Sequence, residues 1–192
     1  MLSEESPDSA ARLRSRRVWI VDPLDGTREF GQPPRSDWAV HVALWSADAD
    51  DLVAGAVALP ATRRVLDSAT VATVPARTGR RARVVLSRSR PPPAGHRVAA
   101  ALDADVVSLG SAGAKVAAVV DGSADAYVET GGLHEWDSAA PVAVARAAGL
   151  AVVLPDGSPL AHNRRDTVQS GLVVCRPEAL AAVLAAVAAG AR

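Results

Sequence analysis

The stretch that most constrains this chain is Trp19–Thr27, which reads WIVDPLDGT. The apolar run Val18–Val21 predicts a buried strand, and Pro23, which has no backbone N–H, is expected to end it. Asp22 and Asp25 then flank a turn. Carboxylates held at the end of a rigid strand suit Mg²⁺, because this cation prefers oxygen ligands in a fixed octahedral arrangement. The alternative is an ordinary surface turn that contains two aspartates.

Two residues follow this turn directly, and their backbone N–H groups are suited to hold a phosphate oxygen beside a metal. They are Gly26 and Thr27. Other hydrolase classes have no support in the sequence. The four histidines show no zinc-ligand spacing such as H-E-x-x-H, and the nucleophile pattern G-x-S-x-G of serine hydrolases does not occur. The sequence therefore favours metal-assisted chemistry on a phosphorylated molecule.

The composition describes a globular chain with no strong charge. It has 192 residues, 49% of them hydrophobic, and a formal net charge of zero, so no overall field attracts nucleic acid or a membrane. Cys175 is the only cysteine, cannot form an internal disulfide, and is expected to be a buried structural thiol. No apolar run is long enough to span a bilayer, and the start lacks a signal-peptide pattern. These features predict a cytoplasmic location.

The first half of the chain, residues 1–81, is expected to form a mainly antiparallel sheet that carries the metal ligands. Residues 6–17 are polar and predict an exposed loop. Three apolar segments predict single strands, and a fourth region predicts a hairpin of two strands. The predicted strands are 18–21, 38–45, 52–59 and the hairpin 64–67 with 70–74. A connector at 78–82 contains the expected boundary between the two halves.

The second half, residues 82–192, is expected to form an α/β part that binds the substrate, because short strands alternate there with helical segments. The predicted strands are 83–87, 105–109, 124–129, 151–154 and 171–175. The predicted helices are 94–102, 111–121, 136–148 and 178–189.

Three further stretches carry chemically active side chains. Glu4 and Glu5 stand near the start of the chain, Asp137 lies in EWDSAA, and Lys115 ends the glycine-containing stretch Gly110–Lys115. Each has an ordinary structural explanation. The glutamates are typical of a solvated chain end, the aspartate of a first helical turn, and the glycines of a tight strand–helix turn. The residues alone leave these alternatives open.

Taken in chain order, the Glu4-Glu5 pair, the DPLDGT stretch and the WDSAA stretch resemble the motifs of the inositol monophosphatase superfamily of metal-dependent, lithium-sensitive phosphatases, and Gly110–Lys115 resembles a segment of its bisphosphate nucleotidases, with one extra residue between serine and lysine. The extension Arg28-Glu29-Phe30 resembles its 3'(2'),5'-bisphosphate nucleotidase branch, the CysQ type. The resemblance implies an α/β, sugar-phosphatase-like αβαβα sandwich. The superfamily has a further helical segment before its Glu-Glu pair, so this chain is expected to lack the first helical layer.

The resemblance also implies a set of metal ligands and catalytic residues. The ligands are Glu4, Asp22, Asp25 and Asp137, together with the backbone carbonyl of Leu24. The implied catalytic residues are Glu4, Asp22 and Thr27, with Glu4 and Thr27 sharing the attacking water. Two or three Mg²⁺ ions and inhibition by Li⁺ are expected. Closely spaced divalent ions would neutralise the phosphate, lower the pKa of a bound water and stabilise the leaving oxygen.

The residues implied for substrate binding are Gly26, Thr27, Ser111, Lys115 and Arg88. The expected substrate is 3'-phosphoadenosine 5'-phosphate, converted to adenosine 5'-phosphate and phosphate in sulfur assimilation. The alternatives are an inositol-1-phosphate or fructose-1,6-bisphosphate phosphatase, or a non-catalytic relic that binds metal or nucleotide. The expected partner is a small phosphorylated nucleotide, sugar or inositol, without a nucleic-acid polymer or a membrane. The resemblance leaves a homodimer open.

The start of the chain at the Glu-Glu segment leads to one more expectation. A fragment, a misassigned start site and a shortened form are the three explanations, and truncation is the favoured one. Loss of the first helical layer would uncover an apolar face of the sheet. It would also place Glu4 beside a free terminus, where side chains are mobile. Impaired activity is therefore expected.

Overall fold

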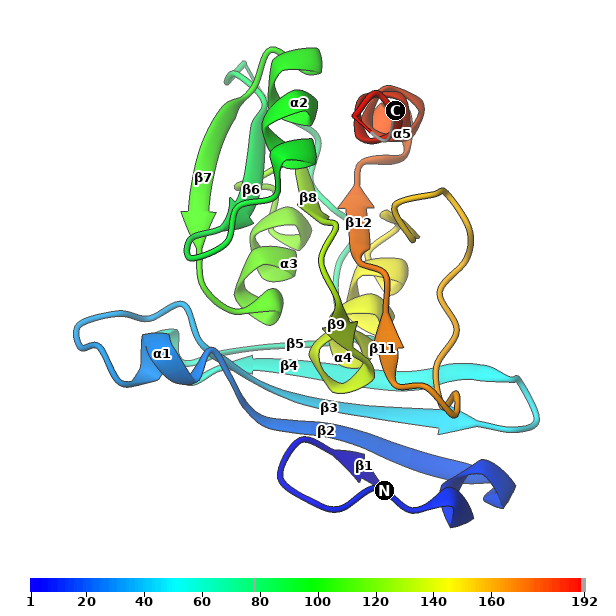
Figure 1. Ribbon diagram of the computed structural model, residues 1–192. Helices are drawn as coiled ribbons and strands as arrows, with labels where there is room; N and C mark the ends of the chain where they lie inside the picture. The colour runs from blue at the N-terminus through cyan, green and yellow to red at the C-terminus, as the bar shows by residue number, and fades with distance from the viewer. Residues whose placement is uncertain (78, 191–192) are drawn as a thin grey trace.

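The first sheet lies at one side of the molecule and carries the Trp19–Thr27 stretch (Figure 1). The computed structural model describes residues 1–77 and 79–190. The strand order is β1-β2-β3-β4-β5, in which β1 is parallel to β2 and the other pairs are antiparallel. The mainly antiparallel sheet expected for the first half is thus confirmed. Its strands are β1 (Leu2–Ser3), β2 (Arg17–Asp25), β3 (Ala39–Ser46), β4 (Asp51–Leu59) and β5 (Arg64–Asp67).

The second sheet is mixed and has the strand order β10-β12-β8-β6-β7. Its strand β6 is parallel to both β7 and β8, whereas β12 is antiparallel to β8 and β10. These strands are β6 (Arg83–Ser87), β7 (Asp105–Leu109), β8 (Ala126–Glu129), β10 (Ala151–Val153) and β12 (Leu172–Cys175). A small antiparallel pair, β9 (Leu133–His134) with β11 (Val168–Gln169), lies between the two sheets (Figure 1).

The α-helices form two layers. Helices α3 and α4 lie between the sheets, and α2 and α5 cover the other face of the second sheet (Figure 1). The order of layers is therefore β-α-β-α, which confirms the expected αβαβα sandwich without its first helical layer. The α-helices are α1 (Thr27–Phe30), α2 (Pro93–Ala101), α3 (Ala112–Val120), α4 (Glu135–Ala147) and α5 (Leu180–Ala188). Short 3₁₀ helices are η1 (Ala10–Arg14), η2 (Pro60–Thr62) and η3 (Pro177–Ala179).

Alternation along the strands explains which face of the first sheet is buried. In β2, Val18 and Ile20 point into the core, whereas Trp19 between them is 51% exposed on the outer face. The inner face packs closely on α4. A Cβ at Gly55 of β4 would lie 2.6 Å from the Cβ of Ala143, so only glycine permits this approach. The helices of the second half thus cover the sheet of the first half.

Three elements differ from the prediction. The strand β2 continues past Pro23 to Asp25, because a register shift between Asp22 and Asp25 absorbs the missing backbone donor. Residues 70–74 form no strand, and the N–H of Val74 instead donates to the carbonyl of Ala148. The stretch 6–17 contains η1, and Arg12 within it is buried. The rest of the stretch is mostly exposed and irregular, as predicted, so the prediction failed at η1 and at Arg12.

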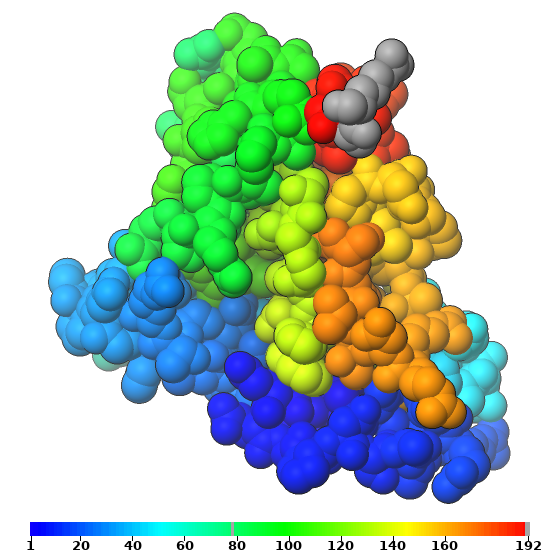
Figure 2. All heavy atoms as spheres, viewed as in Figure 1, coloured from blue at the N-terminus to red at the C-terminus, as the bar shows by residue number. Residues whose placement is uncertain are grey.

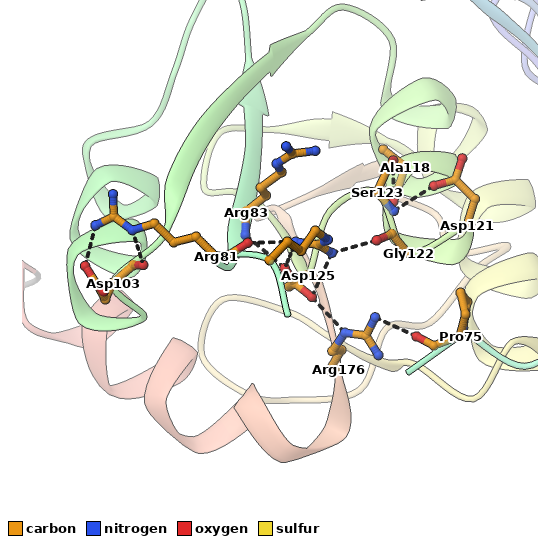
Figure 3. Close-up of polar contacts among 11 residues, drawn as sticks. Pro75, Arg81, Arg83, Asp103, Ala118, Asp121, Gly122, Ser123, Asp125 and Arg176 are labelled. Carbon is orange, nitrogen blue, oxygen red and sulfur yellow. Dashed lines mark hydrogen bonds and ion pairs between the residues drawn. The ribbon is translucent and has the colours of Figure 1, made fainter. Parts of the chain in front are cut away.

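A buried aspartate holds the connector between the two halves. The carboxylate of Asp125 accepts hydrogen bonds from the guanidinium groups of Arg80, at 2.7 Å, and Arg176, at 2.8 Å, and from the backbone N–H of Arg83 (Figure 3). Arg176 also donates to the carbonyl of Pro75. The connector is therefore fixed to the second sheet on both sides of Thr78, which itself lies outside the described residues.

Two simpler expectations can be compared with the structure. Cys175 is a free and fully buried thiol in β12, as expected, and burial raises its pKa to about 12. Among the helices of the described residues, none combines the length and the apolar character needed to cross a bilayer. The predicted division at 81/82 falls between β5 and β6 and stays a prediction.

Candidate active site

Three carboxylates from two distant parts of the chain meet at one point. Asp22 and Asp25 stand in the irregular last part of β2, and Asp137 lies in the first turn of α4. One carboxylate oxygen of each lies within 4.8 Å of the others. The Asp22 side chain is almost fully buried, at 1% exposure. The acids of the DPLDGT and WDSAA stretches therefore form one cluster.

The environment of this cluster disfavours negative charge. The pKa of Asp22 is raised to about 7, first by burial and then by Asp25, against the opposing hydrogen bond from the N–H of Leu24. The pKa of Asp137 is also raised to about 7, by burial and by Asp25, while the N–H of His134 opposes the change. Buried carboxylates that repel one another are a suitable ligand set for a hard divalent cation, which would cancel this charge.

Contacts from three elements hold Asp25 in place. One of its oxygens accepts a 2.9 Å hydrogen bond from the N–H of Gly113 in α3 and lies 3.3 Å from Nε2 of His41 in β3. The other ring nitrogen of His41 lies 3.2 Å from the carbonyl oxygen of Trp136 in α4. Burial lowers the pKa of this fully buried histidine, although Asp25 opposes the shift. His41 therefore links α4 to the carboxylate cluster.

A pocket of about 620 Å³ opens from this cluster. Asp25 and Asp137 line one end together with the turn at Gly26 and Thr27, and the walls come from loops at the ends of the second-sheet strands. The lining residues are Asp25–Glu29, Ser87, Ser89–Pro93, Gly110–Ala112, Lys115, Glu129–Leu133 and Asp137. The site therefore lies between the first sheet and the loops of the second half.

The turn after Asp25 depends on a glycine. Gly26 has φ of +88°, a left-handed conformation, and a Cβ there would lie 3.1 Å from the Cβ of Ser111 and 3.3 Å from the Cα of Trp38. The hydroxyl of Thr27 donates to the carbonyl of Leu24 at 3.3 Å. The carbonyl predicted as a metal ligand thus lies in the same turn as the predicted catalytic threonine.

The glutamate near the chain start is not part of the close carboxylate group. Glu4 is exposed and follows β1, which pairs with Ile20 and Val21. It nevertheless lies near enough to raise the pKa of both Asp22 and Asp137. The structure therefore places Glu4 beside the cluster, and its role as a ligand stays a prediction.

The predicted substrate residues of α3 make specific local contacts. The Ser111 hydroxyl accepts a 2.8 Å hydrogen bond from the N–H of Ala114 and so caps the helix. The ammonium of Lys115 donates to the carbonyl of Gly110 at 2.7 Å and lies 5.1 Å from the ring centre of Tyr127. Burial lowers the pKa of this lysine, and Asp25 opposes the change. Both residues line the pocket.

The structure places Arg88 differently from the sequence-based prediction. Its guanidinium donates to the carboxylate of Glu29 at 2.5 Å, and Arg88 is absent from the pocket lining. Glu29 is only 5% exposed and lines the pocket, so the guanidinium of Arg88 neutralises a buried carboxylate of the pocket wall. The arginines that line the pocket are Arg28 and Arg90. Arg90 follows the same strand two residues later, a position that sequence alone could not separate from Arg88.

Comparison with known proteins places the chain in a family. The model of the inositol monophosphatase family matches residues 1–191. The chain belongs to this family. Its members are metal-dependent phosphatases, which agrees with the carboxylate cluster and with the function class expected from the sequence.

Within the family, named relatives and a solved structure are similar over most of the chain. The 3'-phosphoadenosine 5'-phosphate phosphatase of Mycobacterium bovis is 48% identical over 98% of this chain and 73% of its own length. The 3'(2'),5'-bisphosphate nucleotidase CysQ of Escherichia coli is 31% identical over 87% of this chain and 71% of its own. The crystal structure of CysQ from Bacteroides thetaiotaomicron has a TM-score of 0.78 and 27% identity, and covers 91% of this chain and 76% of that one.

Proposed function

We propose that this protein hydrolyses 3'-phosphoadenosine 5'-phosphate to adenosine 5'-phosphate and phosphate, a reaction of sulfur assimilation. Two named relatives, one 48% and the other 31% identical, are a phosphatase for this nucleotide and a bisphosphate nucleotidase. The observation that carries the proposal is the distribution of charge in the pocket. Asp25 and Asp137, which belong to the carboxylate cluster suited to a metal, line this pocket together with the cations Arg28, Arg90 and Lys115 and the acids Glu29 and Glu129.

This arrangement suits a substrate with two phosphates. The phosphate to be removed would lie at Asp22, Asp25 and Asp137, while the second phosphate would meet an arginine in the pocket wall. Guanidinium groups bind phosphate through paired, charge-assisted hydrogen bonds. An inositol monophosphate has no second phosphate for such a cation, and we therefore rank it below the bisphosphate nucleotide. Fructose 1,6-bisphosphate has two phosphates, as the nucleotide does, so the number of phosphates does not separate these two substrates.

The carboxylate cluster would hold Mg²⁺, which supplies charge neutralisation and activates a water when bound. The chain's own residues orient the reacting groups. Gly26 and Thr27 present backbone N–H groups to a phosphate oxygen, and Thr27 keeps its hydroxyl in the turn through Leu24. Lys115 places a positive charge beside the transferred phosphate. His41 and Gly113 fix the direction of the Asp25 carboxylate.

The test is phosphate release from three compounds at equal concentration, with and without Mg²⁺. They are 3'-phosphoadenosine 5'-phosphate, inositol 1-phosphate and fructose 1,6-bisphosphate. We expect Mg²⁺-dependent turnover, highest with the nucleotide, and its loss in Asp25→Asn. Asp48→Asn is the matched control, because Asp48 is an exposed acid whose ion pair with Arg16 lies at the surface. Preference for inositol 1-phosphate or fructose 1,6-bisphosphate would overturn the proposed substrate. Turnover without a divalent ion would overturn the proposed metal-dependent mechanism.

A further inference from the structure

A second buried carboxylate lies close to the metal cluster but is not part of it. Glu135 opens α4 two residues before Asp137 and is 1% exposed. Its two oxygens accept hydrogen bonds from the backbone N–H groups of Asn163, at 2.6 Å, and Arg164, at 2.8 Å. Its own N–H donates to the carbonyl of Thr167 at 2.8 Å. The first turn of α4 is thus tied to the loop at 163–167.

The same loop is held from its other side by the N-terminal segment. Arg12 of η1 is 3% exposed and donates to the side-chain oxygen of Asn163 at 2.9 Å and to the carbonyl of Arg164 at 2.8 Å. Asp8 accepts two more hydrogen bonds from this guanidinium, at 2.7 and 3.0 Å. Figure 2 shows the corresponding contact, in which the orange segment of the chain lies against the dark blue N-terminal residues.

A second group of contacts fixes α4 at a neighbouring position. The hydroxyl of Ser138 donates to the side-chain oxygen of Gln169 at 2.7 Å and lies 3.2 Å from Nε2 of His162. Ser138 and His162 have no exposed surface. The start of α4 is therefore held on both sides of Asp137, by residues 135 and 138, through partners in the 162–169 loop.

These contacts oppose a specific force. Three carboxylates within 4.8 Å repel one another, and Asp137 is the one that comes from a separate element. A helix that was free to shift would relieve the repulsion by moving Asp137 away, and the ligand set would widen. A buried arginine with hydrogen bonds to both Asn163 and Arg164 resists this movement, because displacing it would leave a desolvated charge unpaired.

We propose that Arg12, Asn163 and Glu135 act together as positioning residues that keep Asp137 at metal-binding distance from Asp22 and Asp25. None of the three touches the substrate; they act through the backbone of the 163–167 loop and of α4. The N-terminal segment, which also carries Glu4, thereby sets the affinity of the site for a divalent cation. This inference rests on the proposed function only in assigning the cluster to a metal.

The test compares Arg12→Met, which keeps an unbranched apolar side chain as far as the Nε position but none of the hydrogen bonds, with Arg16→Met. Arg16 lies in the same segment and is 83% exposed at its side chain, where it pairs with Asp48. We would measure Mg²⁺ binding by calorimetry without substrate, unfolding by urea in a chelator, and kcat and KM at rising Mg²⁺. We expect the Mg²⁺ dissociation constant of Arg12→Met to rise about tenfold, with kcat recovering at high Mg²⁺ and no change in Arg16→Met.

A gentler variant keeps the proposal testable if Arg12→Met fails to fold. Asn163 has φ of +59°, which glycine adopts without strain, so Asn163→Gly keeps the backbone donor to Glu135 and removes only the acceptor of Arg12. We expect its Mg²⁺ affinity to fall about threefold, less than in Arg12→Met because one bond is lost rather than four.

The outcomes separate this inference from the proposed function. Loss of stability with unchanged Mg²⁺ affinity would mean that Arg12 is merely structural and would overturn the inference. Unchanged Mg²⁺ affinity in Asn163→Gly, where Arg12→Met does not fold, would overturn it as well. If the wild type binds Mg²⁺ but does not hydrolyse the nucleotide, the proposed substrate is overturned, and the Mg²⁺-binding test of Arg12 still applies. A wild type that binds no Mg²⁺ would overturn both.

Discussion

The backbone N–H of Gly113 donates a hydrogen bond to the Asp25 carboxylate at 2.9 Å, and this contact joins the end of β2 to the first turn of α3. The strand β2 belongs to the first sheet, whereas α3 lies between the two sheets, and the two elements are closely packed at this point. A Cβ at Gly113 would lie 2.2 Å from Nε2 of His41 and 2.9 Å from the Cβ of Ala39. The carboxylate cluster therefore depends on the absence of one side chain.

Gly113→Ala is expected to damage both stability and metal binding. His41 and Ala39 are fully buried, so neither can yield to a methyl group, and α3 must move away from Asp25. We expect the free energy of unfolding to fall by about 1–3 kcal/mol, as in other overpacked cores. Urea unfolding and Mg²⁺ calorimetry measure the two effects. Gly31→Ala is the control, because the nearest atom to a Cβ there is 3.5 Å away. Equal behaviour of the two variants would contradict the expectation.

In the metal-free protein, the contribution of Asp22 and Asp137 to stability should fall as the pH rises from about 4 to about 7, whereas the buried His41 and His162, whose pKa values are lowered, act in the opposite direction. Asp22 and Asp137 have an ordinary pKa of 3.8, raised to about 7 in the fold, first by burial and then by Asp25. In this window these two carboxyl groups hold protons in the folded state that they have released in the unfolded state, so their contribution to the free energy of unfolding decreases with pH. Thermal unfolding in a chelator at pH 5 and pH 8 measures this difference.

Two comparisons check the origin of the pH effect. Asp22→Asn removes one titrating group and relieves the repulsion of the other two, so its stability should change less with pH. Mg²⁺ should restore the stability of the wild type at pH 8 more than at pH 5, because protons compete with the cation for the carboxylates. An Asp22→Asn variant whose unfolding temperature changes between pH 5 and pH 8 in the chelator by as much as that of the wild type would refute this account.

Arg90 and Arg88 should differ in the kind of defect that their loss causes. Arg90 lines the pocket, so Arg90→Ala should raise KM for the bisphosphate nucleotide about tenfold or more and leave folding intact, since a charge-assisted hydrogen bond contributes about 1.5–3 kcal/mol. Arg88→Ala leaves Glu29 buried without its cation, so it should lower stability. Steady-state kinetics and urea unfolding on both variants measure this. A KM effect confined to Arg88→Ala would show that the substrate draws Arg88 from Glu29.

Asp125 should be important for stability and unimportant for chemistry. Its carboxylate is 4% exposed and pairs with Arg80 and Arg176 (Figure 3). Burial alone would raise its pKa, but the hydrogen bonds from Arg80, Arg83 and Arg176 keep the pKa below its usual range. Asp125→Asn should therefore cost about 3–5 kcal/mol of unfolding free energy, because buried cations lose their partner.

Because the pKa of Asp125 is low, the stabilisation that this carboxylate provides depends on pH. Its stabilisation is present above the ordinary pKa of 3.8 and is lost as the pH falls further, so wild type and Asp125→Asn should converge in acid. Asp103→Asn is the control, since Asp103 pairs with Arg81 at the surface and is 87% exposed. Reduced turnover per folded molecule of Asp125→Asn would contradict a purely structural role.

The sequence predicted the parts of the molecule that short-range patterns encode. Apolar runs located most strands because a strand buried on one or both faces needs such runs, and the helix predicted at 136–148 corresponds to α4 (Glu135–Ala147). The pattern failed at 70–74, where alternating apolar residues pack without pairing. It failed again at Pro23, since a register shift lets the strand continue to Asp25. Neither outcome depends on local composition.

Sequence motifs identified the acids of the candidate metal site, but not the residues that support them. Asp22 and Asp25 were predicted from carboxylates at the end of a strand, Asp137 was added through family resemblance, and the structure brings the three together. Arg12 was not found, because its partner Asn163 lies 151 residues away and nothing near Arg12 signals burial. Glu135 stood in the EWD stretch without a role. Its contacts are with backbone N–H groups, which any sequence offers, so no pairing of side-chain types pointed to them.

The close packing of Gly55 on Ala143 has a consequence for how the chain is made. The inner face of the first sheet is covered by α4, whose residues leave the ribosome long after β5 has emerged. During synthesis the apolar inner face of this sheet is exposed to water. It is covered only after the ribosome has released residue 147, the last residue of α4. The nascent first half is therefore the stage most in need of a chaperone, and the two halves mature together rather than in succession.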